Sequence, residues 1–285
     1  MPGAAAGPSS PSSMLNGVDH YENFPVASVI LPRRWREPVR RIYAFARQAD
    51  DIADEGEAPP EVRLARLEAF RAELNHIAAG KTPTTPLFVA LAETIRRHNL
   101  PLEPFYDLLN AFRQDVVKTR YAHFGEVMEY CRRSANPVGR LLLALYGEND
   151  RRAQAYSDAL CAALQLINFL QDVAIDYRRG RLYLPQDELA RFGVSETQIA
   201  QRDAGGSWWP FMRFQIERAR KLLQAGAPLA RRLPGRLGLE LRLIIAGGET
   251  ILRKIHGVQG DVFHHRPRLE PADWIPMFWR ALRAR

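Results

Sequence analysis

Cysteine is scarce in this 285-residue chain, which contains only Cys131 and Cys161. Two cysteines are too few for a disulfide framework, and neither belongs to a CxxC or His/Cys cluster that would hold a structural zinc ion. This composition is typical of a reducing compartment, so we expect a cytoplasmic protein.

Long apolar stretches are also missing. The longest purely apolar run covers about residues 141–147, well short of the roughly 20 residues that a membrane-spanning helix requires. The first 17 residues are mostly small residues, proline and serine, with neither a charged start nor an apolar stretch. They therefore predict a disordered tail at residues 1–17 rather than a secretion signal, and we assign the folded domain to residues 18–285.

Positive charge exceeds negative charge, with 40 lysines and arginines against 32 aspartates and glutamates, which gives a formal net charge of +8. A basic surface suits nucleic acid, acidic lipid or phosphorylated substrates equally well. A nucleic-acid binder would also need a basic stripe within a recognisable module, whereas the arginines here are dispersed along the chain. We therefore expect no nucleic-acid partner.

Strand-like alternation of Val, Ile and Thr is almost absent after His20, and helical patterns separated by Pro and Gly take its place. The sequence thus predicts an all-α fold, and the lack of a fixed repeat or a long polar linker predicts one domain. Pro38 is well placed at the start of the first strong helix, whose apolar stripe extends to Ala53. Further helices are predicted over residues 61–79, 85–98, 102–119, 124–131, 138–146, 151–176, 209–225 and 237–257.

The first of these helices carries the acidic motif DDIAD at residues 50–54. Asp50 and Asp54 are four residues apart, so both carboxylates lie on one face of a helix and repel each other unless a cation lies near them. Tyr43 and Arg47 fall on the same face, at seven and three residues before Asp50. The motif therefore predicts a polar stripe on a helix that is otherwise largely apolar.

A second acidic motif lies in the predicted helix over residues 151–176. Asp172 and Asp176 repeat the four-residue spacing, and Gln165 and Asn168 precede them on the same face. The rest of this stretch is Leu, Ile, Phe, Val and Ala, and a polar stripe on such a helix needs binding partners.

Two acidic stripes that face one cavity would provide hard oxygen ligands, which suit Mg²⁺ and its habit of bridging carboxylates to substrate phosphates. A single DxxxD pair is more simply a solvated helix face. Two pairs in apolar helices, each beside an amide or an arginine, favour a Mg²⁺ site for a diphosphate. A helical interaction protein without a metal would leave these carboxylates unexplained.

Four segments together resemble the squalene/phytoene synthase family, from about His20 to Leu269. They are HYENFPVAS at residues 20–28, RQADDIAD at 47–54, YCRRSANPVG at 130–139 and QLINFLQDVAIDYRRGRLYLP at 165–185. The resemblance implies an isoprenoid-synthase fold, in which a single-domain helical bundle surrounds a central cavity.

The resemblance also implies roles for particular residues. The metal ligands would be Asp50, Asp54, Asn168, Asp172 and Asp176. The reacting carbons and the diphosphate would be lined by Tyr43, Arg47 and Gln165, with His20, Tyr21, Glu22, Asn23 and Tyr130 closing over them. On physical grounds, aromatic faces such as that of Phe24 could stabilise a carbocation through cation–π contacts. Arg181 and Tyr183 look like the flap over the diphosphate. Gln171 stands in this site where the family usually has an arginine.

Within the family, YENFPVAS, SANPVG and NFLQD look most like the bacterial, hopanoid-pathway branch that forms hydroxysqualene from presqualene diphosphate and water. The alternatives are head-to-head condensation of two prenyl diphosphates, as in presqualene diphosphate, squalene or phytoene synthesis, and then terpene cyclisation. The chain ends at Arg285 without a hydrophobic anchor, as bacterial members do, and we expect no NAD(P)H requirement.

Two features near the C-terminus are interpreted without a role in the site. His264, His265 and Arg266 are taken as a solvated basic tail, and the tryptophans, including Trp274 and Trp279, as core residues by default. A hydrocarbon product of this size partitions into lipid, so we also expect a peripheral contact with the inner face of the cytoplasmic membrane.

Overall fold

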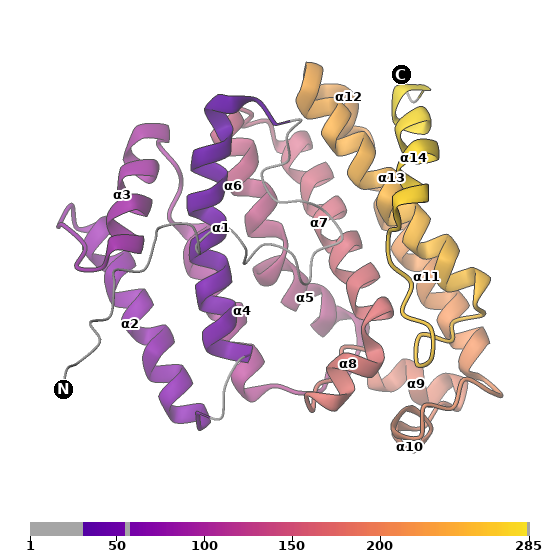
Figure 1. Ribbon diagram of the computed structural model, residues 1–285. Helices are drawn as coiled ribbons and strands as arrows, with labels where there is room; N and C mark the ends of the chain where they lie inside the picture. The colour runs from indigo at the N-terminus through magenta and orange to yellow at the C-terminus, as the bar shows by residue number, and fades with distance from the viewer. Residues whose placement is uncertain (1–30, 55–57, 284–285) are drawn as a thin grey trace, which may run out of the picture.

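The computed structural model describes residues 31–54 and 58–283, and in these ranges it is built from helices, with a single parallel bridge between Arg120 and Leu182. The prediction of an all-α fold is confirmed. Figure 1 shows the helices packed as a bundle. In chain order they are α1 (Arg33–Asp54), α2 (Pro60–Ala78), α3 (Pro86–His98), α4 (Glu103–Val117), α5 (Phe124–Ser134), α6 (Asn136–Tyr146), α7 (Arg151–Gln171), α8 (Val173–Arg178), α9 (Gln186–Phe192), α10 (Glu196–Ala200), α11 (Trp208–Gly226), α12 (Leu229–Arg232), α13 (Gly235–Gly257) and α14 (Pro271–Arg283).

The apolar stripe expected on α1 is buried as a unit, with Ile42, Phe45, Ala49 and Ala53 all in the core. The helix begins at Arg33, five residues before the predicted start at Pro38. Proline is tolerated there at the expense of one backbone hydrogen bond, because it still lies in the second turn of the helix. Burial of the stripe leaves the opposite face of α1, which carries the acidic motif, turned away from the core.

The predicted helix over residues 151–176 is in fact two helices, because α7 ends at Gln171 and α8 begins at Val173. Between them Asp172 leaves the helical conformation, with φ −107° and ψ 14°. Its amide still donates to the carbonyl of Asn168, and its carbonyl accepts from the amides of Ile175 and Asp176. The chain therefore bends at the second acidic motif without losing its backbone hydrogen bonds there.

The core of the described ranges consists of two apolar clusters. The first joins α1 to α4 with Leu141 and Leu145 of α6, and the second is built mainly from α5, α7, α11 and α13. Tyr146 and Leu237 pack against both clusters. Since α1 belongs to one cluster and α7 to the other, the two acidic motifs lie on opposite sides of the junction between them.

None of the helices in the described ranges is long and apolar enough to cross a membrane. The predicted disordered tail at residues 1–17 lies outside the described residues.

Candidate active site

The C-terminal turns of α1 hold Arg47, Asp50 and Asp51 close together. The Arg47 guanidinium lies 2.8 Å from an Asp51 oxygen and 3.7 Å from an Asp50 oxygen. Burial, and next the charge of Asp54, raise the pKa of Asp50 to about 7. The Asp50 side chain nevertheless keeps 40% of its surface exposed. A carboxylate that is surrounded by protein and still reached by solvent lines a concavity.

Asp54, at the end of α1, is held by two arginines from the segment after α8. Arg181 Nη1 lies 2.6 Å from Oδ1 of Asp54, and Arg179 Nη1 lies 3.2 Å from Oδ2. Arg181 is well covered, with 12% of its side chain exposed, whereas Arg179 keeps 46%. These ion pairs join α1 to the chain beyond α8, and Figure 1 shows the end of α1 and α8 at the same end of the bundle.

Asp172, at the bend between α7 and α8, is only 4% exposed and is held by an arginine from the far end of the chain. Arg266 donates from Nε to Oδ1 at 2.6 Å and from Nη2 to Oδ2 at 3.1 Å. Asn168 also donates from Nδ2 to Oδ2 of Asp172 at 3.0 Å. The interpretation of Arg266 as part of a solvated tail is therefore wrong, because this side chain makes a two-point contact with a buried carboxylate.

Asp176 lies one helical turn further along, in α8. Burial raises the pKa of its carboxyl group to about 8, followed by the charge of Asp172, with Asp54 adding in the same direction and Arg181 opposing. Asp54 belongs to the first motif and Asp172 to the second. The two acidic motifs thus share one electrostatic environment, as their common stripe pattern suggested.

Each motif contains one carboxylate that is paired with arginine from elsewhere in the chain, Asp54 or Asp172, and one whose pKa is raised, Asp50 or Asp176. The described part of the chain has no group of three or more His, Cys, Asp or Glu side chains close enough to hold a metal ion by themselves. Magnesium is commonly bound by one or two carboxylates together with substrate phosphates. The donor chemistry and the excess negative charge fit a divalent cation that arrives with a diphosphate.

A further acidic residue outside the two motifs, Asp115 of α4, was not anticipated from the sequence. It is 6% exposed and accepts hydrogen bonds from the Tyr130 hydroxyl at 2.6 Å and the Tyr183 hydroxyl at 3.1 Å. Burial raises its pKa to about 6, although the tyrosine hydrogen bonds oppose the shift. The signal was its position on the apolar face of α4, three residues after Phe112 and seven after Leu108.

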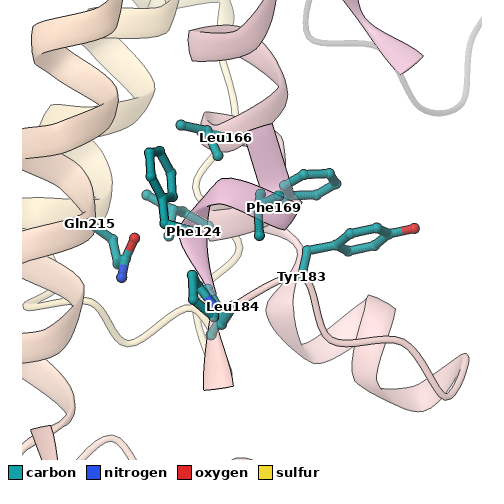
Figure 2. A pocket seen from close by; sticks show the side chains of 9 residues that line it. Phe124, Leu166, Phe169, Tyr183, Leu184 and Gln215 are labelled. Carbon is teal, nitrogen blue, oxygen red and sulfur yellow. The ribbon is translucent and has the colours of Figure 1, made fainter. Parts of the chain in front are cut away.

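Aromatic rings surround this carboxylate. Tyr183 stacks on Phe169 with centroids 4.0 Å apart and planes 5° apart, and Tyr121 and Tyr130 each lie 5.5 Å from Tyr183. Figure 2 shows side chains that line a small, mostly apolar cavity, Leu166, Phe169 and Tyr183 among them, with the Tyr183 hydroxyl directed away from the other labelled side chains. That cavity is too small for an isoprenoid chain.

The remaining expected residues differ in how the structure places them. Tyr43 and Gln165 are half-buried on α1 and α7. Gln171 is 1% exposed and its side-chain amide donates to the carbonyl of Pro267, so it presents almost no surface to a ligand in this arrangement. Of the residues expected to close over the site, Tyr130 is buried on α5. The others, and Phe24 with its expected aromatic face, lie outside the described part of the chain; they are His20, Tyr21, Glu22, Asn23 and Phe24.

Gln171 and Arg266 are neighbours through that contact, because Pro267 follows Arg266 directly. The family usually has an arginine before the first Asp of the second motif. This chain has Gln171 there, and its hydrogen bond to the Pro267 carbonyl holds the segment that carries Arg266. The positive charge beside Asp172 is therefore supplied from 94 residues away in the sequence.

An all-α bundle with two acidic motifs across one junction defines the class of helical isoprenoid synthases. Among solved structures, the chain is similar to squalene synthase HpnC from Alicyclobacillus acidocaldarius, with a TM-score of 0.78 and 40% identity, covering 84% of this chain and 90% of that one.

Comparison with curated proteins and family models agrees. The hydroxysqualene synthase of Rhodopseudomonas palustris is 38% identical over 269 residues, which cover 93% of this chain and 90% of that protein. The hydroxysqualene synthase of Sinorhizobium fredii is 36% identical, covering 89% and 85%. The squalene/phytoene synthase family model matches residues 18–273. The chain therefore belongs to the squalene/phytoene synthase family and is an isoprenoid-processing enzyme.

Proposed function

We propose that this enzyme is a hydroxysqualene synthase, which converts presqualene diphosphate and water to hydroxysqualene and diphosphate in bacterial hopanoid synthesis. The observation that carries the proposal is the proximity of the two acidic motifs: Arg181, which follows the second motif, pairs with Asp54 of the first, and the charges of Asp172 and Asp54 both raise the pKa of Asp176. The relatives named hydroxysqualene synthase support the choice of reaction within the family.

In the proposed reaction the bond from the cyclopropylcarbinyl carbon to the diphosphate oxygen breaks first, and the negative charge develops on the diphosphate. Asp50 and Asp176 are the residues that would hold Mg²⁺, since burial, and next the charge of the neighbouring Asp54 or Asp172, makes their negative charge unfavourable without a nearby cation. Bound there with the diphosphate, Mg²⁺ would supply Lewis acidity for the leaving group. Arg47 and Arg181 would bind the diphosphate oxygens.

The carbocation left behind must be sheltered until one water molecule reaches it. The rings of Tyr130, Phe169 and Tyr183 provide electron-rich faces for this purpose. The water oxygen then bonds to the carbocation and releases one proton. We assign the proton to Asp115, passed through the Tyr130 hydroxyl, because these two groups are 2.6 Å apart.

A squalene synthase is the second candidate, favoured by the name of the Alicyclobacillus relative. That reaction would replace the water by a hydride from NAD(P)H. The two reactions are separated by their requirement for a reductant.

The test is product analysis after the purified chain is incubated with Mg²⁺ and either presqualene diphosphate or farnesyl diphosphate, each with and without NADPH. We expect hydroxysqualene from presqualene diphosphate in both the presence and the absence of NADPH. Squalene formed only with NADPH would establish the second candidate, and turnover of farnesyl diphosphate alone would indicate a condensing enzyme. Asp115→Asn is expected to lower kcat about 10²-fold with little change in KM, and an unchanged kcat would remove Asp115 from the mechanism.

A further inference from the structure

The C-terminal helix α14 exposes large apolar side chains to solvent in a way that the rest of the described chain does not. Outside this helix the exposed large apolar residues are single valines, one on each of four other helices. On α14 there are five, and they include the most exposed aromatic residue described. They are Trp274 at 38%, Ile275 at 68%, Phe278 at 44%, Trp279 at 58% and Leu282 at 42%.

The spacing of these residues makes them one continuous surface. Trp274, Phe278 and Leu282 are four residues apart and form one row along the helix, and Ile275 and Trp279 form the adjacent row. Met277 and Ala281 are buried on the side where α14 packs against α13. Figure 1 shows α14 at the edge of the bundle beside α13. The expectation that Trp274 and Trp279 lie in the core is therefore wrong, because only the opposite side of α14 reaches the core.

The charges beside this surface are positive. Arg280 and Arg283 are exposed and follow the apolar rows around the helix, and the Arg283 guanidinium lies 6.0 Å from the centre of the Trp279 ring. The single acidic residue of α14, Asp273, is paired with Lys254 of α13 at 2.6 Å. A helix with Trp, Phe, Ile and Leu on one side and arginines beside them has the composition of interfacial helices that bind anionic lipid.

Most of the surface lies beyond the residues that the family model matches. The family model ends at residue 273, so nearly all of α14 follows the matched part of the chain. Anionic lipid is a better occupant than a second copy of the chain, because the one acidic residue of α14, Asp273, already pairs with Lys254 and so is a poor partner for Arg280 and Arg283 of another copy. The family acts on prenyl diphosphates, whose long apolar chains and anionic heads match the two sides of this helix.

We propose that α14 docks the enzyme on anionic bilayers, with the rows of Trp274, Ile275, Phe278, Trp279 and Leu282 in the boundary between head groups and acyl chains and with Arg280 and Arg283 against lipid phosphates. The docking is reversible, because one short helix anchors weakly. It depends on no particular reaction, so a failure of the proposed hydroxysqualene synthesis would leave it standing.

The experiment measures partitioning of the full chain onto vesicles of phosphatidylcholine, with and without phosphatidylglycerol, by flotation at low and high salt. We expect binding to the anionic vesicles that weakens with salt. Ile275→Ser with Trp279→Ser lowers the partition coefficient by about tenfold or more, and Arg280→Gln with Arg283→Gln lowers it about fivefold for each charge. Val62→Ser with Val89→Ser, which removes exposed apolar side chains from α2 and α3, is the matched control and leaves binding unchanged.

Three outcomes would overturn the proposal. They are absence of binding by the wild-type chain, equal loss in the control and α14 variants, and a wild-type dimer that becomes a monomer only in the Ile275→Ser/Trp279→Ser variant. Light scattering separates the last outcome from the others. Circular dichroism and thermal melting of the three double variants are expected to match those of the wild type, because every substituted side chain faces solvent.

Discussion

The two acidic motifs of this enzyme have the same spacing but are built in different ways. The first lies on an unbroken turn of α1 with half-buried carboxylates, and its outside partners follow α8. The second straddles a bend, with Asp172 almost fully buried and held by Arg266 from the segment before α14. Each motif nevertheless has one carboxylate paired with arginine and one with a raised pKa. The comparison teaches that the site depends on charge balance between distant segments as much as on local spacing.

The largest effect is expected for the carboxylates with raised pKa. Asp50→Asn and Asp176→Asn should each lower kcat by about 10³-fold, because either change removes charge that would hold the metal and the leaving diphosphate. Helical content should stay unchanged by circular dichroism. Glu61→Gln, on the exposed start of α2, is the control and should retain full activity. Near-normal turnover of one Asp variant would break the equivalence of the two motifs.

Removing Arg266 and removing Arg179 should lower the free energy of unfolding by different amounts, because the carboxylates that they pair with differ in burial. Arg266→Gln leaves the buried Asp172 without its ion pair and is expected to lower the free energy of unfolding by about 3 to 5 kcal/mol. Arg179→Gln removes an exposed partner of Asp54, where Arg181 remains, and is expected to cost about 0 to 1 kcal/mol. Urea unfolding measures both, and equal losses would contradict the contrast between the motifs.

Moving the guanidinium beside Asp172 from position 266 to position 171 tests whether these two positions can exchange roles. Gln171→Arg places a second guanidinium in a buried site next to the Arg266 segment, so we expect a loss of about 1 to 3 kcal/mol in unfolding free energy. Adding Arg266→Gln to this variant should recover part of the loss, since one cation then remains beside Asp172. Additive losses in the double variant would show that the two positions do not exchange roles.

The smallest effect concerns pH. Asp50 and Asp176 have folded pKa values of about 7 and 8, above the ordinary aspartate range, so between about pH 4 and 8 the folded protein binds more protons than the unfolded chain. Stability without metal should therefore fall as pH rises through that window. Because Mg²⁺ must replace these protons, the increase in Tm on adding Mg²⁺ should grow from pH 6 to pH 8, by a few degrees at most.

That trend should vanish in the Asp50→Asn/Asp176→Asn double variant, measured by thermal melting in matched buffers. An equal Mg²⁺ effect at both pH values in the wild-type chain would show that these two carboxyl groups are not where the metal binds.

Much of this architecture was predictable because it is local. The apolar stripe of α1 and the spacing of Asp50 and Asp54 depend on helix geometry alone. The bend at Asp172 was not predictable from the same rule, because the sequence around it remains helical in pattern and the contact with Arg266 comes from a distant segment. Asp115 was missed for a similar reason, since its tyrosine partners come from α5 and from the chain after α8.

The C-terminal region shows the same limit. No helix was predicted over α14, and Trp274 and Trp279 were assigned to the core by their composition. Composition predicts that a tryptophan tends to be buried, but the face that is buried depends on which neighbour the helix packs against. Only the packing of Met277 and Ala281 on α13 decides that the tryptophans lie outside.

The central claim is that the two acidic motifs act as one site for a metal-bound diphosphate. Calorimetric titration of inorganic diphosphate in the presence of Mg²⁺ tests it with four proteins: wild type, Asp50→Asn, Asp176→Asn and the double variant. If the motifs act together, each single change weakens Mg²⁺-dependent binding nearly as much as both changes do. Losses that simply add, or one single variant that binds like the wild type, would contradict the claim.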